Sequence, residues 1–272
     1  MRQPDLEDGI EYWNTREASY DGVLGGFGNG TLPRVDALGS RQFIMTWIPE
    51  LCTVPSAIRP LETPATDPKR RYRALDVGCG VGRTTKDVLL HLVDDVVLVE
   101  PVHKFISVAE AESIQWKGIA EKRKSATFVQ APLQQFDPGK DIAESDTLGR
   151  MGFIPVSVEH GYDIIWCQWC LGHLNHSELV AFFKLATKSL RDLRKGFIFV
   201  KENLCRDMDD GSARVVFDEE DSSLTRSNSA WIDVFTEAGL TVREGKIQQG
   251  LPEGLYPVKM YALQAADSSL DL

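Results

Sequence analysis

A glycine-rich turn at residues 78–82 constrains the fold of this chain more than any other feature. A strand-like run at 73–77 precedes the turn, and a helical pattern follows it over 83–92. The three alternating glycines in Gly78-Cys79-Gly80-Val81-Gly82 let the backbone pass close to a ligand where no Cβ would fit. A strand, a glycine turn and a helix in this order predict an open α/β sheet with a ligand crevice at the carboxyl ends of its strands.

The remaining chain continues the alternation of apolar strands with helices, which is typical of a parallel, doubly wound sheet. Further strands are expected at 95–100, 126–130, 162–167 and 196–201, and helices at 105–121 and 177–190. After a helix at 229–238, strand-like runs at 240–247 and 258–263 predict an antiparallel hairpin on the sheet edge.

The expected fold class is therefore α/β, with a doubly wound, Rossmann-like sheet that is mostly parallel and has an antiparallel C-terminal strand. The 272 residues suit one domain, 1–272, in which residues 1–50 form a helical extension that covers the site. Two stretches, 53–70 and 138–160, are expected to be inserted surface loops.

Composition narrows the class of partner. The net charge of −10 disfavours nucleic acid and favours a cationic partner. No apolar run approaches the roughly 20 residues that span a bilayer, and the N-terminus lacks a signal-peptide core, so we expect a cytoplasmic protein without a membrane partner. We also expect a monomer.

Metal and redox chemistry are not expected. Five cysteines are an odd number in a chain this large, which fits a reducing compartment. Cys167 and Cys170 have C-x-x-C spacing, but no second pair follows, and strand-end packing is the better interpretation than zinc or redox. His173 and His176 likewise lack supporting ligands, so no metal is predicted.

The turn favours S-adenosyl-L-methionine over a dinucleotide, because its pattern is G-x-G-x-G and not G-x-G-x-x-G. Asp76 is placed to orient the cationic amino-acid end of the cofactor, and Glu100 to accept bonds from both ribose hydroxyls. The alternatives are a solvated turn acid for Asp76 and a strand-end cap for Glu100. Arg83 either reaches the cofactor carboxylate or is a surface arginine, while Leu133 and Gln134 are positioned to meet an adenine.

The block at 162–174, Tyr-Asp-Ile-Ile-Trp-Cys-Gln-Trp-Cys-Leu-Gly-His-Leu, resembles a signature of the protein α-N-terminal methyltransferases. These class I enzymes modify proteins that begin X-Pro-Lys after loss of the initiator methionine. Further segments resemble that family in the same order: 12–13, 21–28, 201–203, 218–223 and 251–256. The resemblance extends from about residue 10 to 264, but the stretches at 53–70 and 138–160 exceed the usual length.

The resemblance also implies which residues act. It implies cofactor contacts from Gly78, Arg83, Glu100, Leu133, Gln134 and Gln168, although the family usually has aspartate at the position of Glu100. It implies a peptide channel lined by Trp169, Asn203, Asp218, Asp221, Ser223 and Tyr256, with Leu24 and Leu255 nearby. It further implies that His173 and Asp221 serve proton removal, and Asn203 is included in the predicted catalytic set.

The chemistry of these side chains suits methyl transfer to an α-amine. Such an amine has a pKa near 8, so the site must bind it, remove one proton and aim its lone pair. His173 and Asp221 can accept a proton, and Trp169 offers a π face to the ammonium worth roughly 0.5–2 kcal/mol. The acidic run at 218–221 either holds the third-position lysine of the substrate or is a solvated loop, and His173 alone would be read as a packed or capping residue.

The predicted activity is mono- and dimethylation of X-Pro-Lys N-termini, with trimethylation left open. The resemblance implies ribosomal and other proteins of the cytoplasm and nucleus as targets. The alternatives are a small-molecule N- or O-methyltransferase, an inactive S-adenosylmethionine-binding module and a nicotinamide oxidoreductase, the last disfavoured by the glycine spacing.

Overall fold

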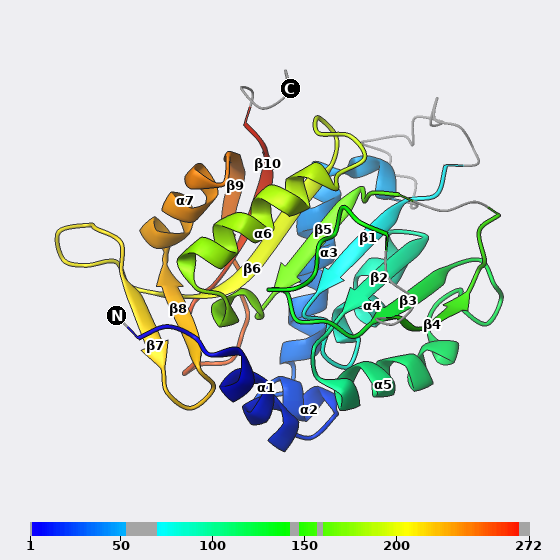
Figure 1. Ribbon diagram of the computed structural model, residues 1–272, viewed down its shortest axis with the longest axis horizontal. Coiled ribbons are helices and arrows are strands. Elements are labelled where there is room, and N and C mark those ends of the chain that lie inside the picture. Colours follow the sequence, from blue (N-terminus) through cyan, green and yellow to red (C-terminus); the bar gives the residue numbers. More distant parts are fainter. Residues whose placement is uncertain (1, 53–69, 142–146, 157–159, 267–272) are drawn as a thin grey trace.

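The computed structural model describes residues 2–52, 70–141, 147–156 and 160–266. Its centre is one mixed sheet in the strand order β4-β3-β2-β1-β5-β6-β10-β9 (Figure 1). The parallel strands are β1 (Arg73–Val77), β2 (Asp95–Val99), β3 (Ser125–Val129), β5 (Ile164–Gln168) and β6 (Phe197–Cys205). These strands confirm the predicted doubly wound α/β class, since the chain crosses from β3 back to β5 beside β1.

Antiparallel strands close both edges of the sheet. β10 (Val258–Ala265) pairs antiparallel with β6, and β9 (Leu240–Ile247) pairs with β10, which confirms the predicted C-terminal hairpin. At the other edge β4 (Thr147–Gly152) pairs antiparallel with β3. The prediction that 138–160 is only a surface loop was therefore wrong over β4, because its backbone supplies hydrogen bonds to an otherwise open edge. The predicted loop at 53–70 lies outside the described residues except for Arg70.

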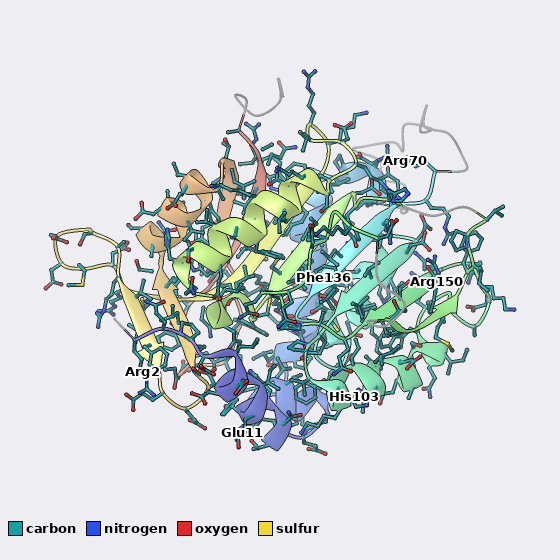
Figure 2. The ribbon with its side chains drawn as sticks, in the orientation of Figure 1. Arg2, Glu11, Arg70, His103, Phe136 and Arg150 are labelled. Atoms are coloured by element: carbon teal, nitrogen blue, oxygen red, sulfur yellow. The ribbon has the colours of Figure 1, made fainter. Side chains whose placement is uncertain are left out.

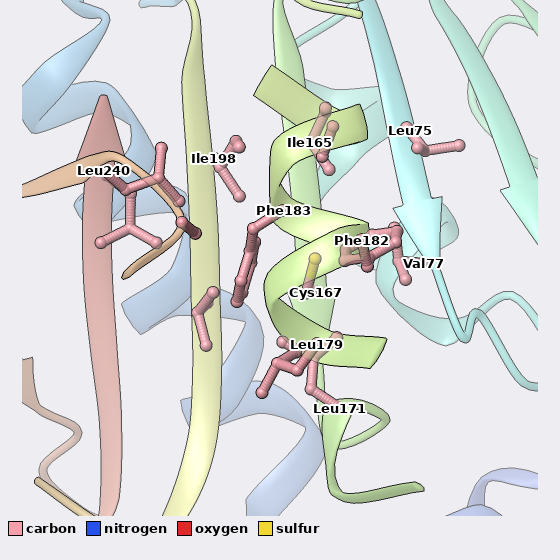
Figure 3. Packing of buried hydrophobic residues seen from close by; sticks show 14 of the residues in the cluster. Leu75, Val77, Ile165, Cys167, Leu171, Leu179, Phe182, Phe183, Ile198 and Leu240 are labelled. Carbon is pink, nitrogen blue, oxygen red and sulfur yellow. The ribbon is translucent and has the colours of Figure 1, made fainter. Parts of the chain in front are cut away.

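Helices cover both faces of the sheet, as Figure 1 shows. One face packs against α6 (His176–Lys188) and α7 (Asn228–Glu237), and the other against α3 (Leu32–Trp47), α4 (Arg83–Asp87) and α5 (His103–Glu112). Alternate residues of β1 explain this: Leu75 and Val77 belong to the first core, and Ala74 to the second. In the first core Phe182 and Phe183 of α6 lie among Leu75, Val77 and Ile165 (Figure 3).

Two helices are shorter than the sequence pattern predicts. The expected helix at 83–92 is α4 followed by a 3-10 turn, η2 (Leu89–His91), and the expected helix at 105–121 is α5 followed by η3 (Ser113–Gln115). The Ser113 hydroxyl donates to the carbonyl oxygen of Glu110, 2.6 Å away, and helps to end α5. The chain then turns so that Trp116 packs on Gly82, where an added Cβ would lie 2.3 Å from the indole. Close packing of the indole on the glycine turn thus overrides the helical pattern.

The N-terminal residues form α1 (Leu6–Thr15), α2 (Tyr20–Val23) and α3, followed by the 3-10 turn η1 (Pro49–Leu51). Asp5 caps α1, because its carboxylate accepts bonds from the amides of Glu7 and Asp8. Next to α1 lies a hairpin that the sequence did not predict, formed by β7 (Val215–Asp218) and β8 (Ser223–Ser227) (Figure 1).

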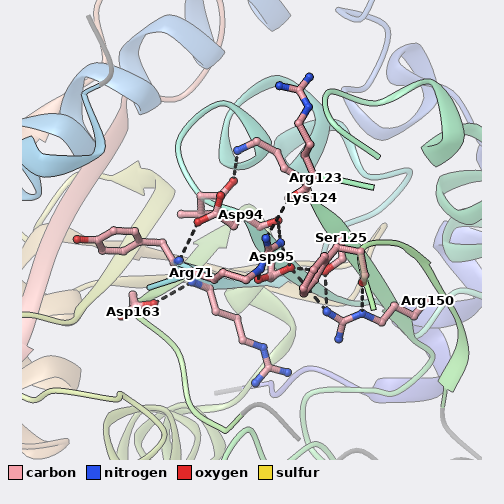
Figure 4. A network of polar contacts seen from close by, with 12 residues as sticks. Arg71, Asp94, Asp95, Arg123, Lys124, Ser125, Arg150 and Asp163 are labelled. Carbon is pink, nitrogen blue, oxygen red and sulfur yellow. Dashed lines mark hydrogen bonds and ion pairs between the residues drawn. The ribbon is translucent and has the colours of Figure 1, made fainter. Parts of the chain in front are cut away.

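An ion-pair network lies around the amino ends of β1, β2 and β3 (Figure 4). Arg71 reaches Asp95 at 2.7 Å, and Arg150 of β4 donates to the Ser125 hydroxyl at 2.8 Å. These contacts stabilise the end of the sheet opposite to the glycine turn, which leaves the carboxyl ends for a site. Within the described residues no helix is long and apolar enough to cross a membrane.

Candidate active site

The glycine turn and Glu100 form the floor of the site. Gly78 has a φ of +62°, and a Cβ there would lie 2.3 Å from the Cβ of Cys170, so only glycine fits. The Glu100 carboxylate accepts bonds from the amides of Gly80 and Val102, each at 2.9 Å. Burial raises the pKa of Glu100 to about 7. Glu100 therefore does cap the loop, as the alternative interpretation held, while its side chain also faces the cavity.

Above this floor lies a cavity of about 970 Å³, counting space open to solvent, which we call the cofactor cavity. The predicted cofactor residues that line it are Gly78, Gly80, Arg83, Glu100, Leu133, Gln134 and Gln168. Residues of α1 and α2, among them Gly9, Trp13 and Val23, line its other side. The N-terminal extension therefore forms part of the cavity wall.

Asp76 does not line the cofactor cavity. Its carboxylate is buried and accepts a bond from the Thr85 hydroxyl at 2.6 Å, and burial raises its pKa to about 7. Asp76 is therefore neither a solvated turn acid nor, in this structure, a residue facing the cofactor. Arg83 is only 5% exposed, so it is not a surface arginine, and its guanidinium pairs with Asp36 at 2.5 Å.

A second cavity, which we call the acceptor channel, adjoins the first and has about 1090 Å³, again counting open solvent. Five residues line both cavities: Trp13, Val23, Leu24, Trp169 and His173. The predicted substrate and catalytic residues that line the channel are Leu24, Trp169, His173, Asn203, Asp221, Ser223, Leu255 and Tyr256. The tertiary fold thus brings residues from five separate segments to the wall of one channel, and two of these segments also line the cofactor cavity.

Trp169 lies at that boundary in a strained backbone conformation, with a φ of +54°. Its amide donates to the carbonyl oxygen of Lys201 at 3.1 Å, which holds the residue against β6. Glu202 accepts bonds from the next two amides, of Cys170 and Leu171, at 3.0 Å each. The loop after β5 is therefore fixed by backbone contacts from the neighbouring strand.

His173 is bonded to the N-terminal extension. The indole N–H of Trp13 donates to Nε2 of His173 at 3.0 Å. Indole is a donor only, so Nε2 accepts and the neutral ring carries its proton on Nδ1. Burial lowers the pKa of His173, and Asp221 opposes that shift. Oδ1 of Asp221 is buried without a hydrogen-bond partner in the described part of the chain.

The acidic run at 218–221 is divided between several contacts. Arg2 pairs with Glu219 at 2.9 Å and Arg16 with Glu220 at 2.7 Å, so two of these acids bind the chain's own N-terminal segment. Figure 2 shows Arg2 beside the end of β7. Asp218 is exposed and does not line the channel. Of the four acids only Asp221 lines the channel, and a lysine site formed by the whole run stays a prediction.

Several residues of the site were not predicted from sequence. Asp36 and Lys201 are fully buried beside Arg83, and Glu202 and Trp231 line the acceptor channel. Asp36 had a detectable signal, since it follows Leu32 by four residues and falls on the apolar stripe of α3. Lys201 and Glu202 fall in the segment 201–203 that resembles the family, but the resemblance gave them no role. Trp231 had no signal, because the pairing of distant segments decides its surroundings.

The cofactor cavity fits S-adenosylmethionine. At Gly78 the floor has no room for a Cβ, so the backbone can approach a ligand closely. Around the cavity the buried carboxylate of Glu100 suits a ribose, the guanidinium of Arg83 suits a carboxylate, and the apolar wall at Leu133 suits an adenine. When bound, the cofactor supplies an electrophilic sulfonium methyl group.

Comparison with known proteins agrees with this chemistry. The model of the AdoMet-dependent proline di-methyltransferase family matches residues 2–264. This chain belongs to that family. It is 37% identical over 256 residues to Alpha N-terminal protein methyltransferase 1 of Arabidopsis thaliana, covering 94% of this chain and 78% of the relative. It is 28% identical to N-terminal Xaa-Pro-Lys N-methyltransferase 1 of Homo sapiens over 253 residues, covering 93% and 92%.

Solved structures lead to the same class. A SAM-dependent methyltransferase of Leishmania major is 31% identical with a TM-score of 0.69, covering 95% of this chain and 82% of that one. The 1,6-didemethyltoxoflavin-N1-methyltransferase of Burkholderia thailandensis, at 14% identity and a TM-score of 0.61, shares the fold and covers 98% and 92%. The chain is therefore an S-adenosylmethionine-dependent methyltransferase with a class I fold. Neither an inactive module nor an oxidoreductase agrees with this family.

Proposed function

We propose that this enzyme methylates the α-amino group of proteins that begin Xaa-Pro-Lys after removal of the initiator methionine. The observation that carries the proposal is the wall shared by the two cavities, where His173 and Trp169 face both the cofactor cavity and the acceptor channel. The names of the relatives supply the substrate class.

The channel provides the groups that this reaction needs. An α-amine must lose one proton before its lone pair attacks. Asp221 lines the channel together with His173 and Asn203, and its Oδ1 has no hydrogen-bond partner in the described part of the chain. Because Trp13 occupies Nε2 of His173, we assign proton removal to Asp221 whenever α1 is seated as it is here. Trp169 then offers its ring to the ammonium or to the substrate proline.

Natural partners are proposed on the same basis. We infer ribosomal and other proteins with Xaa-Pro-Lys N-termini as substrates, met by a monomeric enzyme in the cytoplasm and nucleus. A small-molecule N- or O-methyltransferase is the second candidate, and it would not need the carboxylate of Asp221 in the wall of the acceptor channel.

The test uses synthetic peptides that begin Ser-Pro-Lys or Pro-Pro-Lys, incubated with S-adenosylmethionine and analysed by mass spectrometry. We expect successive gains of one methyl group on the N-terminal residue and no reaction with the same peptide after N-acetylation. A peptide with glutamine at position three tests the lysine requirement. Methylation of an internal lysine, or no reaction with either peptide, would overturn the proposed substrate.

A further inference from the structure

A buried charge cluster lies behind the cofactor cavity. Asp36 of α3 is 0% exposed, and its carboxylate binds three side chains that come from three other segments. Oδ2 pairs with Arg83 at 2.5 Å, and Oδ1 pairs with Lys201 at 2.6 Å and accepts a bond from Gln168 at 2.8 Å. Although burial opposes it, these two cations hold the pKa of Asp36 below its ordinary value.

Lys201 is part of this cluster without touching either cavity. Its side chain is 0% exposed, and it is absent from the walls of both the cofactor cavity and the acceptor channel. Besides Asp36, Nζ donates to the Ser40 hydroxyl at 3.0 Å and to the side-chain oxygen of Gln248 at 2.9 Å. Burial lowers the pKa of Lys201, and Asp36 opposes that shift. An ammonium has three donors and no acceptor, so this shell of oxygens matches the protonated form of Lys201.

The cluster therefore holds two positive charges and one negative charge. In a one-to-one pair, Asp36 would cancel most of the charge on Arg83 and weaken its attraction for a second anion. Because Lys201 shares the same carboxylate, Arg83 keeps an effective positive charge while Asp36 still fixes its position. Arg83 and Gln168 both line the cofactor cavity, so the excess charge acts on whatever binds there.

We propose that Lys201 is a positioning and charge-tuning residue for the cofactor: by sharing Asp36, it leaves Arg83 with the net positive charge that attracts the α-carboxylate of S-adenosylmethionine. The interaction acts through Asp36 and Arg83 and needs no contact between Lys201 and the cofactor. It concerns cofactor binding alone, so it does not depend on which peptide is methylated.

The experiment compares two ligands by isothermal titration calorimetry. One is S-adenosylhomocysteine, and the other is 5′-deoxy-5′-(3-aminopropylthio)adenosine, which is the same molecule without its α-carboxylate. The ratio of their dissociation constants isolates the contribution of the carboxylate. A hydrogen bond to a charged group predicts a ratio of roughly 10 to 100 for the wild type.

Two variants test whether Lys201 sets the effective charge of Arg83. Lys201→Met removes one cation, makes the Asp36–Arg83 pair neutral, and is expected to lower the ratio by about tenfold, mainly through weaker binding of S-adenosylhomocysteine. The double variant Asp36→Asn/Lys201→Met removes one charge of each sign, leaves Arg83 positive, and is expected to return the ratio to within about threefold of the wild type. A residue that only supports the fold would make the double variant worse than the single one.

Lys124→Met is the matched control. Lys124 lies with the network at the amino ends of the strands, where its ammonium donates to the carbonyl oxygen of Val93 (Figure 4). This substitution is expected to leave the ratio unchanged. If Lys201→Met does not fold, Lys201→Gln removes the same positive charge but keeps a side-chain N–H that can donate to Asp36, and the same fall in the ratio is expected. An unchanged ratio in Lys201→Met, or a lowered ratio in the folded double variant, would overturn the proposal.

Discussion

Trp13→Phe tests the bond between the N-terminal extension and His173. Phenylalanine keeps an aromatic ring on α1 but removes the indole N–H that donates to Nε2 of His173 at 3.0 Å. Only an unprotonated Nε2 can accept this bond, because the imidazolium ion carries a proton on both nitrogens. The bond therefore stabilises the neutral ring, and its loss must raise the pKa of His173.

The size of the effect follows from the strength of one hydrogen bond. A typical buried hydrogen bond contributes about 1 kcal/mol net, and one pKa unit corresponds to about 1.4 kcal/mol. Removing the indole donor is therefore expected to raise the pKa of His173 by about 0.7. The starting value lies below 6.5, because burial of the ring disfavours the imidazolium ion. At pH values near the new pKa, a larger fraction of His173 becomes charged.

The assay is a pH titration of the histidine ring signals by NMR in the protein without cofactor. The chain has five histidines, and the spectrum of His173→Gln identifies the signal of interest. The ring ¹⁵N shifts report the tautomer directly, and the wild type is expected to carry its proton on Nδ1. Trp47→Phe is the matched control, since the indole of Trp47 also donates at 3.0 Å, but to Glu244 away from the site.

Two results would refute this reasoning. The first is a wild-type ring that carries its proton on Nε2, because Trp13 could not then donate to it. The second is a pKa of His173 that stays constant or falls in Trp13→Phe. A rise of equal size in Trp47→Phe would show a general effect of indole removal and would also remove the assigned role of Trp13.

Three further predictions concern the floor of the site and the acceptor channel. Gly78→Ala places a Cβ 2.3 Å from the side chain of Cys170, so we expect the free energy of unfolding in urea to fall by about 2–4 kcal/mol. The control Gly25→Ala, where φ is +59° but the space is open, should lose only about 1 kcal/mol. Equal losses in the two variants would contradict a clash at Gly78. Burial raises the pKa of Glu100 from 4.5 to about 7, so its contribution to stability is present below pH 4.5 and is lost as the pH rises through 7. Plots of the free energy of unfolding against pH for Glu100→Gln and the wild type should therefore diverge between these two values. Parallel plots would be evidence against the raised pKa. Asp221→Asn should lower kcat by about 100-fold or more, with the Kd of S-adenosylhomocysteine within about threefold of wild type, and equal losses of both would exclude a role in proton removal.

The order of elements in the chain determined the fold class. A strand, a glycine turn and a helix, followed by alternating elements, specified a doubly wound sheet because each apolar segment has a period that suits one kind of element. The sequence also located the cofactor floor, since Gly78 and Glu100 act through backbone conformation and position at strand ends. Backbone conformation and position at a strand end both depend on neighbouring residues in the chain, so a local sequence pattern is enough to predict them.

Contacts between distant segments were decided only by the tertiary structure. The sequence placed Asp76 at the cofactor, yet alternation along β1 turns its carboxylate toward Thr85 on the α3 and α4 face. It treated 218–221 as one acidic surface, but Arg2 and Arg16, some two hundred residues away, bind two of its members.

Arg83 is the clearest example of what the sequence determined and what only the tertiary structure decided. The sequence predicted a contact between Arg83 and the cofactor carboxylate from its place after the glycine turn, with a surface arginine as the alternative. Only the fold shows that Asp36 and Lys201 share its charge, because the free energy of a buried ion depends on every charged group within a few ångströms, whichever segment supplies it.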